Sequence, residues 1–104
     1  MPRAKYHVVV TDDASDDLLN IGLYIAEESP AAALRIVGRL RGAVAELGDR
    51  AMRYALVPSH EDSGIRRRVV GSYNIHYHVT DDRVEVLHIL HHARDQEQLL
   101  FPED

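Results

Sequence analysis

The chain has 104 residues, of which 45% are hydrophobic and 28% are charged, a composition typical of one globular domain. Its net charge of −5 argues against nucleic acid as the main partner, because nucleic-acid-binding proteins normally carry a basic surface. It has no cysteine, no apolar run of the ~20 residues that a membrane span needs, and an N-terminal segment unlike a secretory signal. We therefore expect one cytosolic domain over residues 1–104 with no membrane association.

A strand and a first helix are predicted at the start of the sequence. The β-branched run over 5–10 (KYHVVV) is typical of a strand. Thr11 follows as an N-cap, and the aspartates after it lie in a first helical turn, where the macrodipole favours carboxylates. Apolar residues then recur at helical spacing as far as Ile25, so this helix should end near Glu28.

A second helix should follow almost at once. Ser29 and Pro30 stand in the favoured order of N-cap and first helical residue, and apolar residues recur at helical spacing from Ala33 to Leu47. Gly48 is the expected glycine just after the C-terminus. Because the connection is so short, the two helices should form an antiparallel hairpin.

The last third of the sequence predicts a three-strand antiparallel meander. Three β-branched and aromatic runs within 64–94 are separated by Gly71-Ser72 and by Asp81-Asp82. Two-residue connections of these types are typical of tight hairpins.

The remaining segments complete the predicted fold. Residues 49–63 show no sustained period and form a long irregular connection, and 95–101 predicts a short final helix. The order β-α-α-β-β-β-(α) indicates an α+β fold. In it, a helical hairpin packs on one face of a mostly antiparallel four-stranded sheet.

Alternation along the meander assigns side chains to the two sides of the sheet. With two-residue turns, Tyr77 pairs with Val86 and Ile75 with His88, which points Tyr73, Ile75 and Tyr77 toward the helices. The outward side then carries a mixed polar and apolar set: Ile65, Arg67, Val69, Asn74, His76, His78, Glu85, Leu87, Ile89 and His91.

Two arginines fall on the helix side in this assignment. An unpaired guanidinium is costly to bury, so Arg66 and Arg68 should lie at the edge of the core. There we expect them to pair with helix-borne acids such as Asp16, Asp17 or Glu46.

The histidines raise a metal hypothesis, which the spacing disfavours. His76 and His78 share one side of a strand with Glu85 opposite, but zinc needs three or four ligands in fixed geometry. The sequence contains no HExxH motif and no second spaced pair, so solvent-exposed histidines are expected and no metal or other cofactor is predicted.

The end of the last strand offers a possible acid–base set. His91 and His92 could carry protons near neutral pH, and Arg94 could stabilise a phosphorane, with Arg67 and His76 on the same side of the sheet. An RNA-cleaving site is therefore chemically possible. The alternative is a polar strand end that hydrogen-bonds a neighbouring loop.

Several short patterns occur in a characteristic order over residues 6–100. They are Ala14-x-x-Asp17-Leu18-x-x-Ile21, Ser29-Pro30-x-x-Ala33, Gly64-x-Arg66, Tyr73-x-Ile75-x-Tyr77-x-Val79, and the run Val86-Leu87-His88-Ile89-Leu90-His91-x-Ala93-Arg94-Asp95. In this order and spacing the chain resembles the RelE/ParE toxin superfamily of bacterial toxin–antitoxin modules. The resemblance implies the β-α-α-β-β-β fold and a small cytosolic toxin. It also implies a hetero-oligomer with a neutralising antitoxin, ParD-like or of another type, encoded next to the toxin.

The resemblance leans toward the ParE-like branch, whose members poison DNA gyrase by protein binding. RelE-like toxins cleave messenger RNA and are usually basic. They commonly have an arginine where this chain has Asn74 and a tyrosine where it has Leu100. These departures and the net charge of −5 favour gyrase as the target, with no catalytic residues.

A ribosome-dependent messenger-RNA endoribonuclease is the alternative, because some cleaving relatives rely on a Glu/His/Arg set. Glu61, Arg67, His91 and Arg94 would then be catalytic, with His60 as a substitute proton carrier. A non-toxic relative retained only for complex formation is a third possibility.

Residues expected to contact the target or the antitoxin lie on the outward side of the sheet, near Arg66 and in the C-terminal turn. They are Arg66, Arg67, Asn74, His76, His91, Arg94, Leu99, Leu100 and Phe101. Apolar side chains near a chain end can anchor an interface, or they can simply cap a core.

Overall fold

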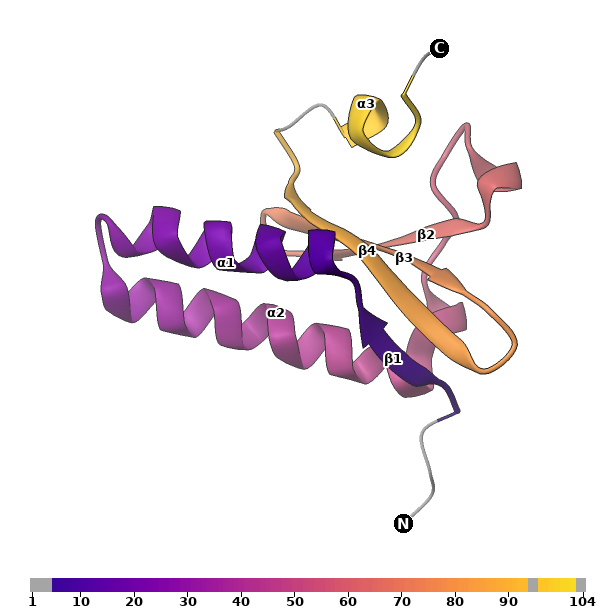
Figure 1. Cartoon of the computed structure of the whole chain (residues 1–104), viewed down its shortest axis with the longest axis horizontal. Coiled ribbons are helices and arrows are strands. Elements are labelled where there is room, and N and C mark those ends of the chain that lie inside the picture. Colours follow the sequence, from indigo (N-terminus) through magenta and orange to yellow (C-terminus); the bar gives the residue numbers. More distant parts are fainter. Residues whose placement is uncertain (1–4, 94–95, 103–104) are drawn as a thin grey trace.

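The computed structural model describes residues 5–93 and 96–102, which form a helical hairpin, a four-stranded sheet and a short C-terminal helix (Figure 1). The elements are β1 (His7–Val10), α1 (Asp12–Ala26), α2 (Pro30–Arg50), β2 (Ile65–Val70), β3 (Tyr73–Val79), β4 (Arg83–His91) and α3 (Gln96–Leu100). Two 3-10 turns, η1 (Ala51–Arg53) and η2 (Glu61–Ser63), interrupt the long connection before β2. The predicted α+β order is confirmed.

Both predicted helix starts are confirmed by their caps. Thr11 Oγ1 accepts a hydrogen bond from the amide of Ala14, and Ser29 Oγ accepts one from the amide of Ala32. The predicted end of the second helix is wrong, because α2 continues past Gly48 to Arg50. Gly48 is buried where the chain entering β1 crosses α2, and its carbonyl accepts a hydrogen bond from the amide of Tyr6.

The sheet has the strand order β1-β4-β3-β2, with β1 parallel to β4 and the other neighbours antiparallel. The first hairpin has the predicted register: Val70 pairs with Tyr73 and Arg68 with Ile75. Gly71 makes this tight turn possible, because its φ of 59° is a left-handed conformation that other residues rarely adopt.

The second hairpin departs from the predicted register halfway along β4. Val86 pairs with Tyr77 as expected, but His88 pairs with His76, so Leu87 is an extra residue in a β-bulge. An extra residue exchanges the two sides of the sheet for the rest of the strand. The assignment of Ile89 and His91 to the outward side was therefore wrong, and both lie on the helix side.

The main core lies between the helices and the sheet. Of the three side chains predicted to point inward, Ile75 and Tyr77 are fully buried and Tyr73 is half-buried at the end of the sheet. They meet the apolar stripe of α2 and the inward residues of β4: Leu40, Ala43, Val44, Leu47, Val84, Val86 and Ile89. Burial raises the pKa of Tyr77 to about 12, and its hydroxyl donates to the carbonyl of Ala51.

The arginine prediction is confirmed in one of its two cases. Arg68 Nη2 lies 2.9 Å from Glu46 Oε1, and its Nη1 donates to the carbonyl of Ala43. This contact lowers the pKa of the Glu46 carboxyl. Arg66 donates to the backbone carbonyl of Tyr54 instead of a carboxylate. Arg66 therefore stabilises the long connection, and Arg68 stabilises the position of α2.

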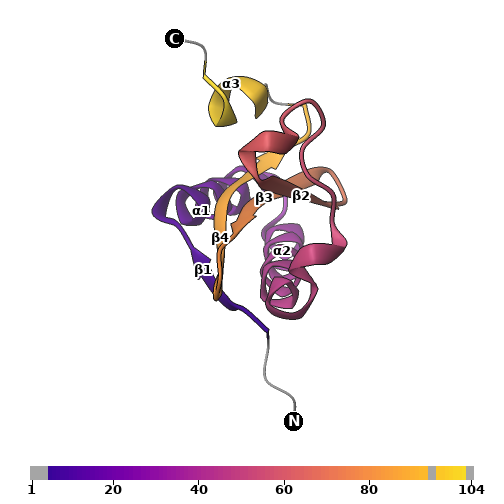
Figure 2. The same ribbon diagram turned by 90° about the vertical axis from the view of Figure 1, so that its right-hand side faces the viewer.

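Helix α1 completes the edge of the sheet that β1 leaves open. β1 pairs with β4 only over Arg83–Val86, and beyond that point α1 packs beside β4 (Figure 2). Thr11 takes over from β1, because its amide and hydroxyl both donate to the carbonyl of Val86. Asp17 Oδ2 then accepts a hydrogen bond from the amide of Ile89 at 2.9 Å, which satisfies a backbone group of the strand edge.

The far end of the helical hairpin projects beyond the strands (Figure 1). The sheet therefore does not cover this part of α1 and α2, which leaves large apolar side chains in contact with solvent. Among the described residues, no helix combines the length and the apolar character needed to cross a bilayer.

Candidate functional site

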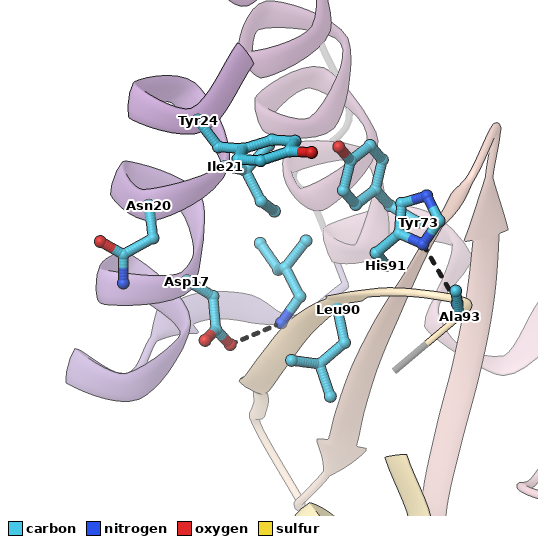
Figure 3. A pocket seen from close by; sticks show the side chains of 9 residues that line it. Asp17, Asn20, Ile21, Tyr24, Tyr73, Leu90, His91 and Ala93 are labelled. Atoms are coloured by element: carbon cyan, nitrogen blue, oxygen red, sulfur yellow. Dashed lines mark hydrogen bonds between the residues drawn. The ribbon is translucent and has the colours of Figure 1, made fainter. Parts of the chain in front are cut away.

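A hollow of about 480 Å³ lies between α1 and the end of β4, and we call it the α1 cleft (Figure 3). Its walls come from α1 on one side and from β3 and β4 on the other. They are formed by Asp17, Asn20, Ile21, Tyr24, Tyr73, Ile89, Leu90, His91 and Ala93.

Aromatic rings dominate the upper part of the α1 cleft. The Tyr73 and His91 rings meet edge to face with centroids 5.4 Å apart, and Tyr24 extends toward Tyr73 from α1 (Figure 3). Burial, followed by the nearby Tyr24, raises the pKa of Tyr73, so its phenol stays protonated near neutral pH. Neutral phenols provide flat apolar surface and a polar tip, which suits recognition of a protein side chain.

Two polar side chains of the α1 cleft, Asp17 and His91, have hydrogen-bond partners within the chain. Asp17 Oδ2 lies 2.9 Å from both the amide of Ile89 and Nδ1 of His88, and His91 Nδ1 accepts from the amide of Ala93. Asp17 therefore fastens α1 to β4, and the cleft is better suited to binding than to proton transfer.

The middle of the opposite side of the sheet is covered, contrary to the prediction that this side faces solvent. His76 is 0% exposed and Asn74 is 6% exposed, whereas Val69 on the same side is 64% exposed. The long connection and the C-terminal segment lie over His76, and His60 stacks on Phe101 with centroids 3.7 Å apart. The hydrophobic pattern of β3 gave no sign of this second layer, because both covering segments are distant in sequence.

A smaller cavity of about 230 Å³ remains under this cover, and we call it the C-terminal pocket. Its lining comes from the long connection, β2, β3 and the chain end: Val57, Pro58, Ser59, Arg67, His76, Leu100 and Phe101. Burial lowers the pKa of His76 to about 4, and the nearby Arg67 and His88 act in the same direction. His76 is therefore a neutral imidazole at physiological pH.

The residues proposed for RNA cleavage are divided between the two sides of the sheet. Arg67 and His76 pair across β2 and β3 on the covered side, whereas His91 pairs with Tyr73 on the helix side. Glu61 lies on η2, where its carboxylate accepts a hydrogen bond from the amide of Ser59. Arg94 lies outside the described residues.

The C-terminal residues predicted as contacts fall into two groups. Leu99 is 43% exposed and remains available to a partner. Leu100 and Phe101 are half-buried over the C-terminal pocket, so they cover part of the sheet.

Within residues 5–93 and 96–102, no group of three or more His, Asp or Glu side chains is placed to hold a metal ion. His78 Nδ1 instead lies 3.4 Å from Glu85 Oε1 as a simple cross-strand contact.

A third hollow lies between α1 and α2, away from the sheet, and measures about 540 Å³. We call it the interhelical groove, and its walls are Ser15, Leu18, Leu19, Gly22, Leu23, Ala26, Pro30, Ala33, Leu34, Val37 and Arg41. Leu19, Leu23 and Leu34 are 61%, 59% and 79% exposed. Their sequence signal was present, since Leu19 and Leu23 are four residues apart and form a second apolar line on α1.

The architecture and these surfaces define a small α+β domain that is equipped to bind other proteins. The model of the family described as "ParE toxin of type II toxin-antitoxin system, parDE" matches residues 8–96. The chain belongs to this family, so it is the toxin component of a type II toxin–antitoxin system.

Solved structures support the same fold. A chain of the chromosomal ParDE toxin–antitoxin system from P. aeruginosa is 23% identical, with a TM-score of 0.72 over 85% of this chain and 97% of that one. A chain of the toxin–antitoxin complex RelBE2 from Mycobacterium tuberculosis is 22% identical, with a TM-score of 0.58 over 84% and 98%. No curated protein matches the sequence.

Proposed function

We propose that this toxin inhibits DNA gyrase by protein–protein binding in the cytoplasm and is held inactive by an antitoxin encoded beside it. Membership of the ParE toxin family supports this proposal. The observation that carries it is the separation of Arg67 from His91 on opposite sides of the sheet. Because His91 lies on the helix side, the described residues do not assemble a set that joins His91 to Arg67, and we favour binding over RNA cleavage as the account of toxicity.

The interhelical groove is the surface that we assign to the antitoxin. Its exposed leucines suit the apolar face of an amphipathic helix, and Arg41 at the rim would pair with a carboxylate beside that face. The outer edge of β2 is a poorer site for an added strand. Val57 donates to the carbonyl of Ile65, and the amide of Arg67 donates to the carbonyl of Ala55, so the long connection occupies this edge.

A charge placed in the interhelical groove is expected to weaken antitoxin binding. Leu23→Glu should lower the affinity about tenfold or more, because complex formation would bury a carboxylate without a partner. Isothermal titration calorimetry with the adjacent antitoxin measures the change. Met52→Glu is the matched control, since Met52 is also exposed (55%) but belongs to η1, outside the groove. Equal affinities for the two variants would remove the groove from the interface.

The gyrase proposal is tested with purified proteins. We expect the toxin to block plasmid supercoiling by DNA gyrase and the antitoxin to restore it in the same reaction. Normal supercoiling at excess toxin would contradict the proposal. In that case, cleaved messages and arrested translation in cells expressing the toxin would indicate the endoribonuclease alternative.

A further inference from the structure

Two polar side chains of the C-terminal pocket have no hydrogen-bond or ion-pair partner among the described residues. Neither ring nitrogen of the buried His76 has a hydrogen-bond partner in the described chain. Its cross-strand neighbour Arg67 is half-buried, and no hydrogen bond or ion pair joins its guanidinium to a described residue. Both residues line the same cavity of about 230 Å³.

The arrangement is unfavourable for the fold alone. A buried polar group normally has a hydrogen-bond partner, and the groups without one often mark a bound water, an ion or a functional site. A leucine in place of His76 would fill the space without burying two nitrogens. A ligand that supplies the missing contacts would explain the imidazole at this position.

We propose that the C-terminal pocket binds a phosphate group, with the Arg67 guanidinium and the His76 imidazole donating hydrogen bonds to its oxygens. Arg67 supplies the positive charge and the planar fork of donors that fits phosphate oxygens. His76, neutral at physiological pH, donates from one ring nitrogen. The positive charge of Arg67 disfavours a cation at the same place.

The cover of the pocket suggests how a ligand enters. Leu100 and Phe101 line its cover, and Phe101 stacks on His60. α3 has only five residues, so a ligand could enter by a local displacement of this short segment. The stacked rings at the rim also offer a flat surface to a nucleobase, so the phosphate can come from a nucleotide or be free in solution.

Nuclear magnetic resonance of the full chain tests the proposal, with inorganic phosphate and adenosine monophosphate as probes. We expect each probe to shift the imidazole ¹⁵N resonances of His76 and to saturate. Arg67→Gln should weaken binding about tenfold or more, because it removes a charge-assisted contact. Arg35→Gln, which removes the same charge from an exposed site on α2, should leave binding unchanged.

Tighter binding of the nucleotide than of inorganic phosphate would identify nucleotides as the source, and equal binding would identify the free ion. Unchanged His76 resonances with both probes would overturn the proposal. The proposal would also be overturned if the shifts failed to saturate, or if Arg67→Gln and Arg35→Gln weakened binding of the probes equally. Phe101→Ala provides a second route, since it should speed ligand exchange if Phe101 covers the pocket. None of these outcomes depends on whether gyrase is the target.

Discussion

Asp17→Ala is expected to lower the free energy of unfolding by about 3 kcal/mol, although Asp17 belongs to an acidic run that resembles an ordinary helix start. Its carboxylate accepts a hydrogen bond from the amide of Ile89, in the part of the β4 edge that β1 does not reach. The same oxygen also contacts His88. Without it, the amide is left unpaired and α1 loses its polar attachment to the sheet. Urea denaturation followed by circular dichroism measures the loss.

The neighbouring aspartate provides the control for this prediction. Asp16 is exposed on the other side of the helix, so Asp16→Ala should change the free energy of unfolding by less than about 0.5 kcal/mol. Asp17→Asn should lie between the two, because its amide oxygen still accepts from Ile89. Similar losses for the two alanine variants would mean that the carboxylate does not hold α1 on β4.

Local sequence signals predicted the elements well, because their causes are local. Thr11 and Ser29 start the helices through hydrogen bonds to residues three positions later. Gly71 makes the first hairpin turn by its own backbone conformation. The contact of Arg68 with Glu46, one of the three acids predicted as partners, followed from the cost of burying an unpaired guanidinium.

The misplaced side chains have non-local causes. The β-bulge at Leu87 lies within a continuous strand-forming run and has no glycine or proline to mark it, so the predicted faces of Ile89 and His91 were exchanged. His76 is buried by two segments that alternation within β3 cannot reveal. For these two reasons Arg67, His76 and His91 do not share one open face, as the predicted acid–base arrangement required.

The corrected positions of these side chains also bear on the function of this toxin. The helical hairpin and the α1 cleft are open surfaces of this toxin, whereas the middle of the sheet side that was predicted as a reaction surface is buried at Asn74 and His76. A protein that presents apolar grooves and tyrosine rings to solvent is suited to binding other proteins.

His76→Leu is expected to stabilise the protein at neutral pH and to reduce its sensitivity to acid. At neutral pH the gain should be about 1–2 kcal/mol, because an apolar side chain of similar size replaces buried nitrogens that lack partners. The acid effect follows from the pKa of His76, which is lowered to about 4 in the folded protein from an ordinary 6.5. Between these values the unfolded chain binds a proton that the folded chain does not, so stability falls as the pH falls.

This proton uptake lowers the free energy of unfolding by about 3 kcal/mol between neutral pH and pH 4. His76→Leu should not show this loss. The carboxyl of Glu46, whose pKa Arg68 lowers, loses its pairing in acid in both proteins, so comparing their urea midpoints at each pH isolates His76. His7→Leu removes an exposed imidazole and should follow the wild type. Parallel acid curves for the wild type and His76→Leu would show that His76 is not buried as a neutral group. A more stable variant that no longer binds phosphate would instead show that the imidazole lowers stability and serves binding.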